Sequence, residues 1–399
     1  MTSALEVRLG DVAEFIRGIN FKPDDVVPLG TEGSVGCMRT KNVQEELDCS
    51  DVWAVSREFV RREEQLLAEG DILVSSANSW NLVGKCSWIP KLAWPSSFGG
   101  FVSVLRAAPD KVEPRFLYRW FSSERTQALL RSFGQKTTNI SNLNIERCLN
   151  LILWLPPLPE QRRIAAILDQ ADALRAKRRE ALAQLDELQQ AIFIETFGDP
   201  ATNPKGWPIT TVGDLLKSAS YGTSEKSATS GEFPVLRMNN ITRTGEFDLS
   251  DLKYMDLADS EHERYLVKTG DVLFNRTNSA ELVGKTAIFR EKIPMAYAGY
   301  LIRLRTNESN DPEYLSGFMN TAYAKRILRG MCKSIIGMAN INATEVQSIK
   351  LAKPPLKLQT QYRQRIGALL QVKACYRASL TELDSLFSSL QHRAFRGEL

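Results

Sequence analysis

The chain has 399 residues, of which 43% are hydrophobic and 25% charged, a composition typical of soluble globular proteins. The length predicts two or three domains rather than one core. The formal net charge of +4 is compatible with a nucleic-acid partner but does not require one. Because the chain has only two histidines, His262 and His392, zinc binding and histidine-based acid–base catalysis are poorly provided for.

The cysteines, the first ten residues and the short apolar runs favour a cytoplasmic protein. The cysteines are scattered without a C-x-x-C pair, so we expect them to be reduced core residues. Residues 1–10 lack the basic and apolar regions of a secretion signal. The longest apolar runs, such as 149–157, are too short to cross a bilayer, and no membrane partner is expected.

The first predicted region, residues 1–155, mixes helices with short strands. Runs such as 71–75 and 101–105 have strand character, and Gly, Asn and Ser interrupt them as turns do. Two prolines, Pro156 and Pro157, end this region. Residues 159–197 then predict one long helix, which Gly198 and Pro200 terminate.

The second half of the chain repeats the first at a shift of about 200 residues. Three groups of residues recur in order: Gly70-Asp71-Ile72-Leu73 as Gly270-Asp271-Val272-Leu273, Leu82-Val83-Gly84-Lys85 as Leu282-Val283-Gly284-Lys285, and Pro156-Pro157-Leu158 as Pro354-Pro355-Leu356. A repeat of this length indicates two tandem copies of one module rather than a solenoid. We therefore predict mixed domains over 1–155 and 201–353, and helices over 156–200 and 354–399, the second helix running from about 357 to 396.

Both predicted helices carry apolar residues at heptad spacing. The seam positions are Leu168, Ala171, Arg175, Arg178, Leu182, Leu185, Gln189 and Ile192 in the first, and Ile366, Leu369, Lys373, Tyr376, Leu380, Leu383, Phe387 and Leu390 in the second. This spacing favours an antiparallel coiled-coil pair. The polar members Arg175, Arg178 and Lys373 either set the register or extend outward to solvent.

Such a helix pair would hold two mixed modules apart. A helix of about 38 residues is about 57 Å long at 1.5 Å per residue. On B-DNA that length exceeds one helical turn. This geometry favours the recognition of two separated half-sites.

Each mixed domain concentrates side chains that suit base edges and phosphates in segments that read as loops. The alternative is that Asn and Ser gather there because turns favour them. The candidate DNA-binding residues are Arg39, Lys41, Asn42, Ser75, Ser76, Asn78, Lys136, Thr137 and Thr138 in the first copy, and Arg237, Asn239, Asn240, Asn275, Arg276, Asn278, Lys333 and Ser334 in the second. Ser75-Ser76 becomes Asn275-Arg276 inside an unchanged frame, as two readers of different half-sites require.

No catalytic, cofactor-binding or metal-binding residues are predicted. Gly284-Lys285-Thr286 resembles the end of a phosphate-binding loop, but Ser279 stands where that loop needs its first glycine. The repeat instead predicts a structural turn or a backbone contact to phosphate.

The segment from Pro156 to Gln161, the closing Phe193-Ile-Glu-Thr-Phe-Gly-Asp-Pro200 and the C-terminal Leu390-Gln-His-Arg-Ala-Phe-Arg-Gly-Glu-Leu399 resemble the conserved helices of Type I restriction-modification specificity subunits. The resemblance covers essentially the whole chain. Lys357-Leu358 stands where the first copy has Pro159-Glu160, which leaves the start of the second helix open.

The resemblance implies two pseudo-symmetric target-recognition domains, each reading one half of a bipartite double-stranded DNA site, and a coiled coil that sets the spacer. It implies a non-catalytic subunit that docks two methyltransferase subunits and, in the full complex, restriction subunits. S-adenosylmethionine, ATP and Mg²⁺ would be bound by those partners. Apolar residues outside the seam, Leu174, Leu188, Val372 and Leu386, are the candidate partner-binding positions.

Two other hypotheses stay open from the residues alone. The chain could be a coiled-coil scaffold or adaptor that does not read DNA, in which case exchanging residues 1–155 would leave the methylated sequence unchanged. It could also be a phosphate-loop enzyme, which would require the isolated chain to bind nucleotide.

Overall fold

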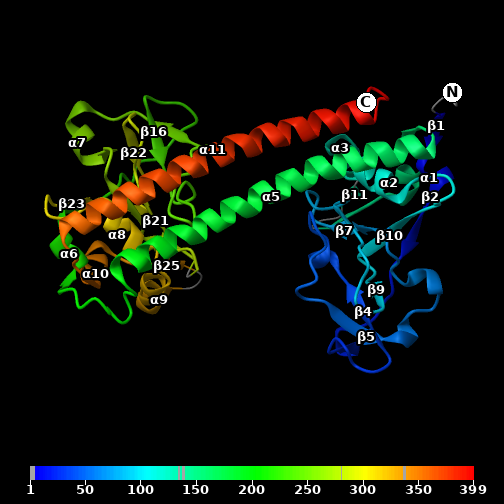
Figure 1. Ribbon diagram of the computed structural model, residues 1–399, viewed down its shortest axis with the longest axis horizontal. Helices are drawn as coiled ribbons and strands as arrows, with labels where there is room; N and C mark the ends of the chain where they lie inside the picture. The colour runs from blue at the N-terminus through cyan, green and yellow to red at the C-terminus, as the bar shows by residue number, and fades with distance from the viewer. Residues whose placement is uncertain (1–4, 134, 137–139, 280, 336–337) are drawn as a thin grey trace. The chain divides into compact units, whose positions relative to one another are not determined.

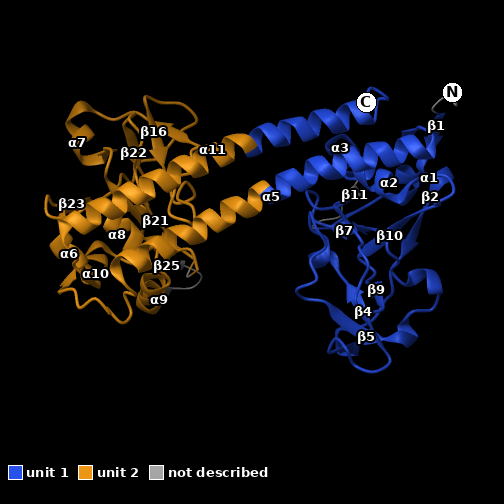
Figure 2. Ribbon diagram, viewed as in Figure 1, with its two compact units in different colours: residues 1–177, 380–399 blue, residues 178–379 orange. Residues whose placement is uncertain are grey.

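The computed structural model describes residues 5–133, 135–136, 140–279, 281–335 and 338–399. The chain forms two compact units: unit 1 contains residues 1–177 and 380–399, and unit 2 contains residues 178–379 (Figure 2). Each unit therefore consists of one mixed domain together with a segment of each long helix. The predicted domains treat those helices as separate segments, and this division of the chain stays a prediction.

Unit 1 has a central antiparallel sheet in the order β2-β10-β6-β8. Its strands are β2 (Ala13–Arg17), β10 (Val102–Ala107), β6 (Ile72–Ser75) and β8 (Cys86–Trp88). The other sheets contain β3 (Val26–Val27), β5 (Trp53–Ser56), β4 (Ser34–Met38) and β9 (Ser96–Phe98); β11 (Gln135–Lys136), β12 (Ser141–Asn142) and β7 (Ala77–Asn78); and β1 (Leu5–Arg8) with β13 (Ile152–Leu155). The short helices are α1 (Leu9–Val12), α2 (Pro114–Phe121), α3 (Glu124–Ser132) and α4 (Ile145–Leu149).

Unit 2 repeats this set of sheets, with the central order β15-β23-β19-β21. Its central strands are β15 (Leu216–Tyr221), β23 (Leu301–Thr306), β19 (Val272–Asn275) and β21 (Thr286–Ile288). The others are β17 (Lys253–Met255), β16 (Phe233–Leu236), β22 (Met295–Tyr297) and β18 (Leu266–Val267); β20 (Thr277–Asn278), β25 (Met338–Asn340) and β24 (Lys333–Ile335); and β14 (Ile209–Thr211) with β26 (Lys350–Ala352). The short helices are α6 (Val212–Leu215), α7 (His262–Tyr265), α8 (Pro312–Met319), α9 (Ala322–Met331) and α10 (Ala343–Gln347).

The repeated Gly-Asp motif closes the central sheet of each unit. Gly70 and Gly270 adopt φ values of +95° and +94°, which L side chains rarely adopt. The aspartate that follows is buried and forms an ion pair with an arginine of the neighbouring strand: Asp71 with Arg106 at 2.7 Å, and Asp271 with Arg305 at 2.7 Å. The motif therefore recurs because it fixes one turn and one pair of strands.

The two long helices are α5 (Leu158–Phe197) and α11 (Leu356–Ala394), and both begin at the leucine of the Pro-Pro-Leu motif. Gln161 and Gln359 are buried and make equivalent bonds. The amide nitrogen of each donates to the carbonyl of the first proline, and its oxygen accepts from the backbone N–H of Glu113 or Asp311. The substitution of Lys357-Leu358 for Pro159-Glu160 thus leaves the start of the second helix unchanged.

Within each unit, the segments of α5 and α11 pack as an antiparallel pair. In unit 1, Arg163 contacts Leu399 and Arg175 contacts Asp384, and in unit 2 Glu195 contacts Arg365. The residues of the predicted heptad seam face the interior: Leu168 and Ile366 are fully buried, and every seam position is at least half-buried. The predicted architecture, two repeated mixed domains with long antiparallel coiled-coil helices, is confirmed (Figure 1).

The polar seam residues form bonds across the pair rather than extending to solvent. In unit 1, Arg175 pairs with Asp384 at 2.6 Å, and its guanidinium lies 4.3 Å from the Phe387 ring centre. In unit 2, Lys373 is fully buried and pairs with Asp186 at 2.5 Å. These two ion pairs occupy equivalent positions 198 residues apart, so the register interpretation fits the structure.

Candidate nucleic-acid interface

A small three-stranded sheet in each unit brings two of the three predicted segments together. In unit 1, Asn78 of β7 is paired with Ser141 of β12, and β11 follows on the other side. In unit 2, Thr277 of β20 is paired with Asn340 of β25, next to β24. Figure 1 labels β7 and β11 of the first sheet and β25 of the second. Residues far apart in sequence thus form one local surface.

In unit 1, four of the predicted residues of the first copy lie on this sheet or beside it: Ser75, Ser76, Asn78 and Lys136. Ser75 is buried and its hydroxyl accepts from the Asn78 amide at 3.1 Å. Ser76 and Asn78 are half-buried, and Lys136 lies on β11. Thr137 and Thr138 lie outside the described residues.

In unit 2, the equivalent positions carry different chemistry. Arg276 donates to Asn340 Oδ1 at 3.2 Å and lies 4.8 Å from the Tyr221 ring centre. Asn275 is fully buried, and its side-chain nitrogen and oxygen have no hydrogen-bond partner in the described part of the chain. Asn278 is half-buried, and Lys333 and Ser334 lie on β24.

The third predicted segment lies in the loop after β4 or β16, and its asparagines hold that loop closed. The Asn42 amide donates to the carbonyls of Asp48 and Asp51 at 2.7 and 3.0 Å. Asn240 makes the same two bonds to Asp248 and Asp251, both at 2.9 Å. Like Ser75 and Asn275, these asparagines are buried, and their own bonds to the loop carbonyls give them a structural role in this conformation. Contact between these four side chains and DNA stays a prediction.

The predicted basic residues of this loop form ion pairs within it. Arg39 lies 3.7 Å from the centre of the Trp53 ring and pairs with Asp51 at 3.1 Å, while Lys41 pairs with the same carboxylate at 2.6 Å. Hydrogen bonds from Lys41 and Arg39 lower the pKa of Asp51. In unit 2, Arg237 pairs with Asp251 at 2.9 Å. Asn239 is exposed, and its amide lies 3.5 Å from the same Asp251 carboxylate.

The lysine of the repeated Gly-Lys motif, which directly precedes β8 or β21, joins this loop to the central sheet. Lys285 donates to the carbonyls of Met238, at 2.7 Å, and Ile241. Lys85 donates to the Gln44 side chain at 2.6 Å. The preceding Gly84 and Gly284 have φ values of +83° and +80° and pack against α3 and α9. These contacts fit the predicted structural turn.

Sequence reasoning missed one residue that ties this loop to the helix pair. Glu246 accepts bonds from Lys373 and, at 2.5 Å, from Arg377 of α11. Burial opposes its ionisation, but the bonds from Arg377 and Lys373 outweigh burial and lower the pKa of Glu246. The residues around Glu246 do not indicate this role, because its partners lie more than 120 residues away in the sequence.

The four predicted partner-binding residues all lie on exposed helix faces. Leu174 and Leu386 are 54% and 50% exposed in unit 1, and Leu188 and Val372 are each 44% exposed in unit 2. Each unit therefore exposes one of these four residues on α5 and one on α11, and unit 2 also exposes Ile194 and Leu356. The partner that covers them stays a prediction.

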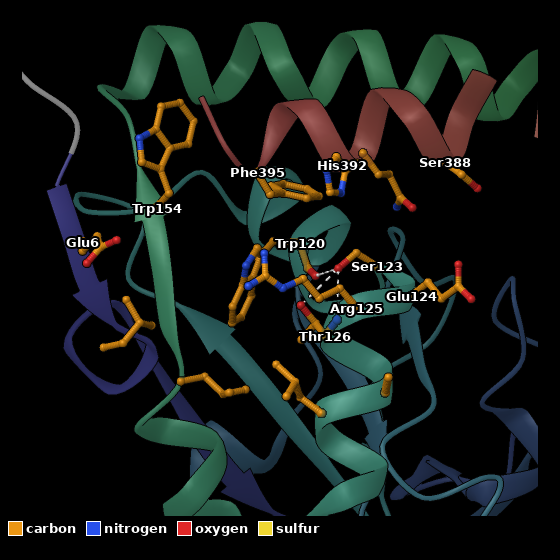
Figure 3. A pocket seen from close by; sticks show the side chains of 15 residues that line it. Glu6, Trp120, Ser123, Glu124, Arg125, Thr126, Trp154, Ser388, His392 and Phe395 are labelled. Carbon is orange, nitrogen blue, oxygen red and sulfur yellow. Dashed lines mark hydrogen bonds between the residues drawn. The ribbon is translucent and has the colours of Figure 1, made fainter. Parts of the chain in front are cut away.

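A cavity of about 540 Å³ in unit 1 lies between the β1–β13 pair, α3 and the last turns of α11. Figure 3 shows Trp120, Trp154, His392 and Phe395 around it. Its hydroxyls have structural bonds: Ser123 caps α3 and donates to the Trp120 carbonyl at 2.7 Å. His392 lies 3.0 Å from Arg396. These bonds favour a packing gap rather than a reaction centre.

The described part of the chain contains neither a metal-binding cluster nor a membrane-spanning helix. No group of three or more His, Cys, Asp or Glu side chains in the described part of the chain is placed to hold a metal ion. None of the described helices has both the length and the apolar character that spanning a bilayer requires.

Comparison with known proteins identifies the family. The sequence model of the Type I restriction modification DNA specificity domain matches residues 4–185 and 204–372. The chain is 26% identical to the Type I restriction enzyme EcoKI specificity subunit of Escherichia coli K12, and 24% identical to the StySPI specificity subunit of Salmonella potsdam. Each match covers 97% of this chain and 87% of the relative.

Two solved structures share the fold. A chain from a study of complex assembly and conformational transition of the type I R-M system has a TM-score of 0.57 at 18% identity, covering 100% of this chain and 99% of that one. The S subunit of a Type I restriction-modification system from M. genitalium has a TM-score of 0.56 at 15% identity, covering 98% and 96%. With two matches to the same domain model, one in each half, the chain belongs to the family of Type I restriction-modification DNA specificity proteins.

Proposed function

We propose that this chain is the subunit that reads DNA sequence for a Type I restriction-modification enzyme, with each unit reading one half of a bipartite site. One observation carries the proposal: the two units repeat the same small sheet but change the side chain that directly precedes its first strand. Ser76 in unit 1 becomes Arg276 in unit 2, while the turns at Gly84 and Gly284 are kept. Arginine can bind guanine through two hydrogen bonds, whereas serine suits phosphates or several bases.

Methylation, ATP hydrolysis and cleavage would belong to partner subunits, which would bind S-adenosylmethionine, ATP and Mg²⁺. We propose that two methyltransferase subunits dock on the exposed apolar positions of the helices, one on Leu174 and Leu386 and one on Val372 and Leu188. The presence of one such pair in each unit supports this number.

The test of sequence reading is an exchange of residues 1–155 for the same region of another member of the family. The exchanged chain is assembled with its methyltransferase, and the methylated sites are mapped by sequencing. One half of the site should change and the other should stay as in the parent. An unchanged site would show that this chain is a scaffold that does not read DNA.

The role of the helices in setting the spacer has its own test. Inserting seven residues in α5 and seven in α11 adds about 10 Å of helix, or about three base pairs of B-DNA. The mapped site should keep both halves and gain a longer spacer. A functional variant whose spacer is unchanged would contradict this role.

A further inference from the structure

Each unit exposes one large aromatic side chain at the turn that leads into the long strand of its central sheet. Phe101 precedes β10 and is 65% exposed, and Tyr300 precedes β23 and is 53% exposed. The two positions are equivalent, because the residue after each ring makes the same turn bond. The N–H of Val102 donates to the Gly99 carbonyl, and the N–H of Leu301 donates to the Ala298 carbonyl. Both copies of the module thus expose an aromatic side chain to solvent at the same position.

The backbone of both aromatic residues is fixed to the predicted recognition segment. The Phe101 carbonyl accepts from the N–H groups of Ser76 and Ala77, both at 3.1 Å. The Tyr300 carbonyl accepts from the N–H of Arg276 at 3.0 Å. The rings therefore lie beside the three-stranded sheets, on a rigid turn.

Positive charge accompanies each ring, and the surrounding segments have no acidic residue. In unit 2, Arg276 lies against Tyr221, which is itself 42% exposed. In unit 1, the strand position of Tyr221 is taken by Arg17, as its pairing with Ser103 shows. The adjoining segments 17–20, 75–79 and 99–102, and in unit 2 221–224, 275–279 and 298–301, contain no Asp or Glu. The next acidic residues along unit 2 are Glu225 and Glu281, outside these segments. Exposed rings and arginines in segments without a carboxylate complement nucleic acid.

We propose that Phe101 and Tyr300 contact the bases of bound DNA, each within the half-site that its own unit reads. The inference rests on the proposed function and adds contact residues that base-edge hydrogen bonding does not predict. Aromatic side chains pack against base faces or thymine methyl groups, or insert between base steps, and all three modes would remove these rings from water. Removing such a contact weakens DNA binding by roughly tenfold.

The experiment uses the full chain assembled with its methyltransferase. Wild-type mapping first defines the site, and dissociation constants are then measured for a duplex with the site and for one without it. Phe101→Ala and Tyr300→Ala are compared with Ile293→Ala, which removes a side chain that is 65% exposed between β21 and β22. Tyr300→Phe keeps the ring and controls for the hydroxyl.

Both alanine variants should lose about tenfold in affinity for the specific duplex, each with relaxed methylation in one half only. Ile293→Ala and Tyr300→Phe should stay within about twofold of wild type. If the wild type discriminates but both alanine variants bind and methylate as it does, the inference is overturned while the proposed function stands. If the wild type shows no preference for any duplex, the proposed function fails as well.

Discussion

Units 1 and 2 share their sheets but pack their mixed domains against the helix pair in different ways. In unit 1 ion pairs accompany apolar contacts such as that of Phe116 with Phe395: Arg119 of α2 is 5% exposed and pairs with Asp169 at 2.6 Å and Asp172 at 2.8 Å on α5. Asp172 also binds Arg175, which reaches Asp384 of α11. A continuous row of alternating charges therefore joins the domain to both helices.

In unit 2 these ion pairs are missing among the described residues, and a larger aromatic cluster lies beside their position. Phe193 and Phe197 of α5 contact Tyr314 of α8 and Tyr362 of α11, with ring centres 4.8 to 5.9 Å apart. Gly317 stands at the position of Arg119, and a Cβ there would lie 2.5 Å from the Tyr362 hydroxyl. One scaffold thus accepts two kinds of packing, and each can be disrupted separately.

The largest effect on stability is expected from removing one ring of the aromatic cluster. Phe193→Ala should lower the free energy of unfolding of unit 2 by about 3–5 kcal/mol, because Phe193 is 2% exposed and the cavity cannot fully collapse. Hydrogen exchange measured on peptides of each unit reports the loss locally. Its equivalent in unit 1, Gln391→Ala, serves as the control and should change protection little. Equal losses in both units would contradict independent packing.

Breaking the ionic row should cost less. Asp172→Ala removes a partner from both Arg119 and Arg175 and should destabilise unit 1 by about 2 kcal/mol, since these arginines are largely buried. The comparison variant is Glu160→Ala, which breaks a solvent-exposed pair with Arg163 and should cost about 0.5 kcal/mol or less. Denaturant unfolding followed by tryptophan fluorescence suits this test, because six of the seven tryptophans lie in unit 1. Equal costs for the two variants would show that the row does not stabilise the unit.

Much of the fold could be predicted from the sequence, because it follows local pattern. The helices predicted at 159–197 and 357–396 begin within one residue and end within two residues of α5 and α11. Heptad spacing also predicted that Leu174 and Val372 would lie outside the seam, and both are exposed.

The site was harder to predict, because its geometry depends on distant partners. Asparagine is a residue type that can read a base edge. The Asn42 side chain, however, donates to carbonyls six and nine residues later along the chain. The row from Arg119 to Asp384 joins positions up to 265 residues apart, which periodicity does not reveal. The sequence pattern predicts a strand that includes Phe101, and only the three-dimensional structure shows that its side chain is exposed to solvent.

A pH-dependent difference between the units is expected at Lys325, whose equivalent in unit 1 is Gln127. Burial, together with Lys285 and Arg329, lowers the pKa of Lys325 to about 7. Between pH 7 and its ordinary pKa of 10.5, the unfolded state binds one proton more than the folded state, so this residue makes stability rise with pH. Its contribution approaches 1.4 kcal/mol per pH unit.

The measurement is the free energy of unfolding of Lys325→Gln relative to wild type at pH 7, 8 and 9. The variant should be more stable near pH 7, by about 1 kcal/mol, and less stable than the wild type by pH 9, because the difference changes by more than about 1 kcal/mol per pH unit. A difference that stays constant with pH would show that Lys325 is protonated in both states.

The smallest effect is expected from transferring aromatic packing into unit 1. Gln391→Phe places a ring beside the cavity that Trp120 and Phe395 line, where Phe116 and Phe395 already meet with centres 5.6 Å apart. Filling this space should stabilise unit 1 by about 1 kcal/mol. Calorimetry of the variant and of Ser388→Ala, a polar change on the same wall, provides the comparison. A destabilised variant would mean that the ionic geometry of unit 1 has no room for a ring.

The central claim, that each unit reads its own half of a DNA site, is tested most directly by methylation mapping with Arg276→Ala. Arg276 directly precedes the first strand of the small sheet of unit 2, and Ser76 holds the equivalent place in unit 1. The account predicts that discrimination relaxes at positions in one half-site while the other half-site and the spacer stay as in the wild type. Equal relaxation of both halves would contradict it.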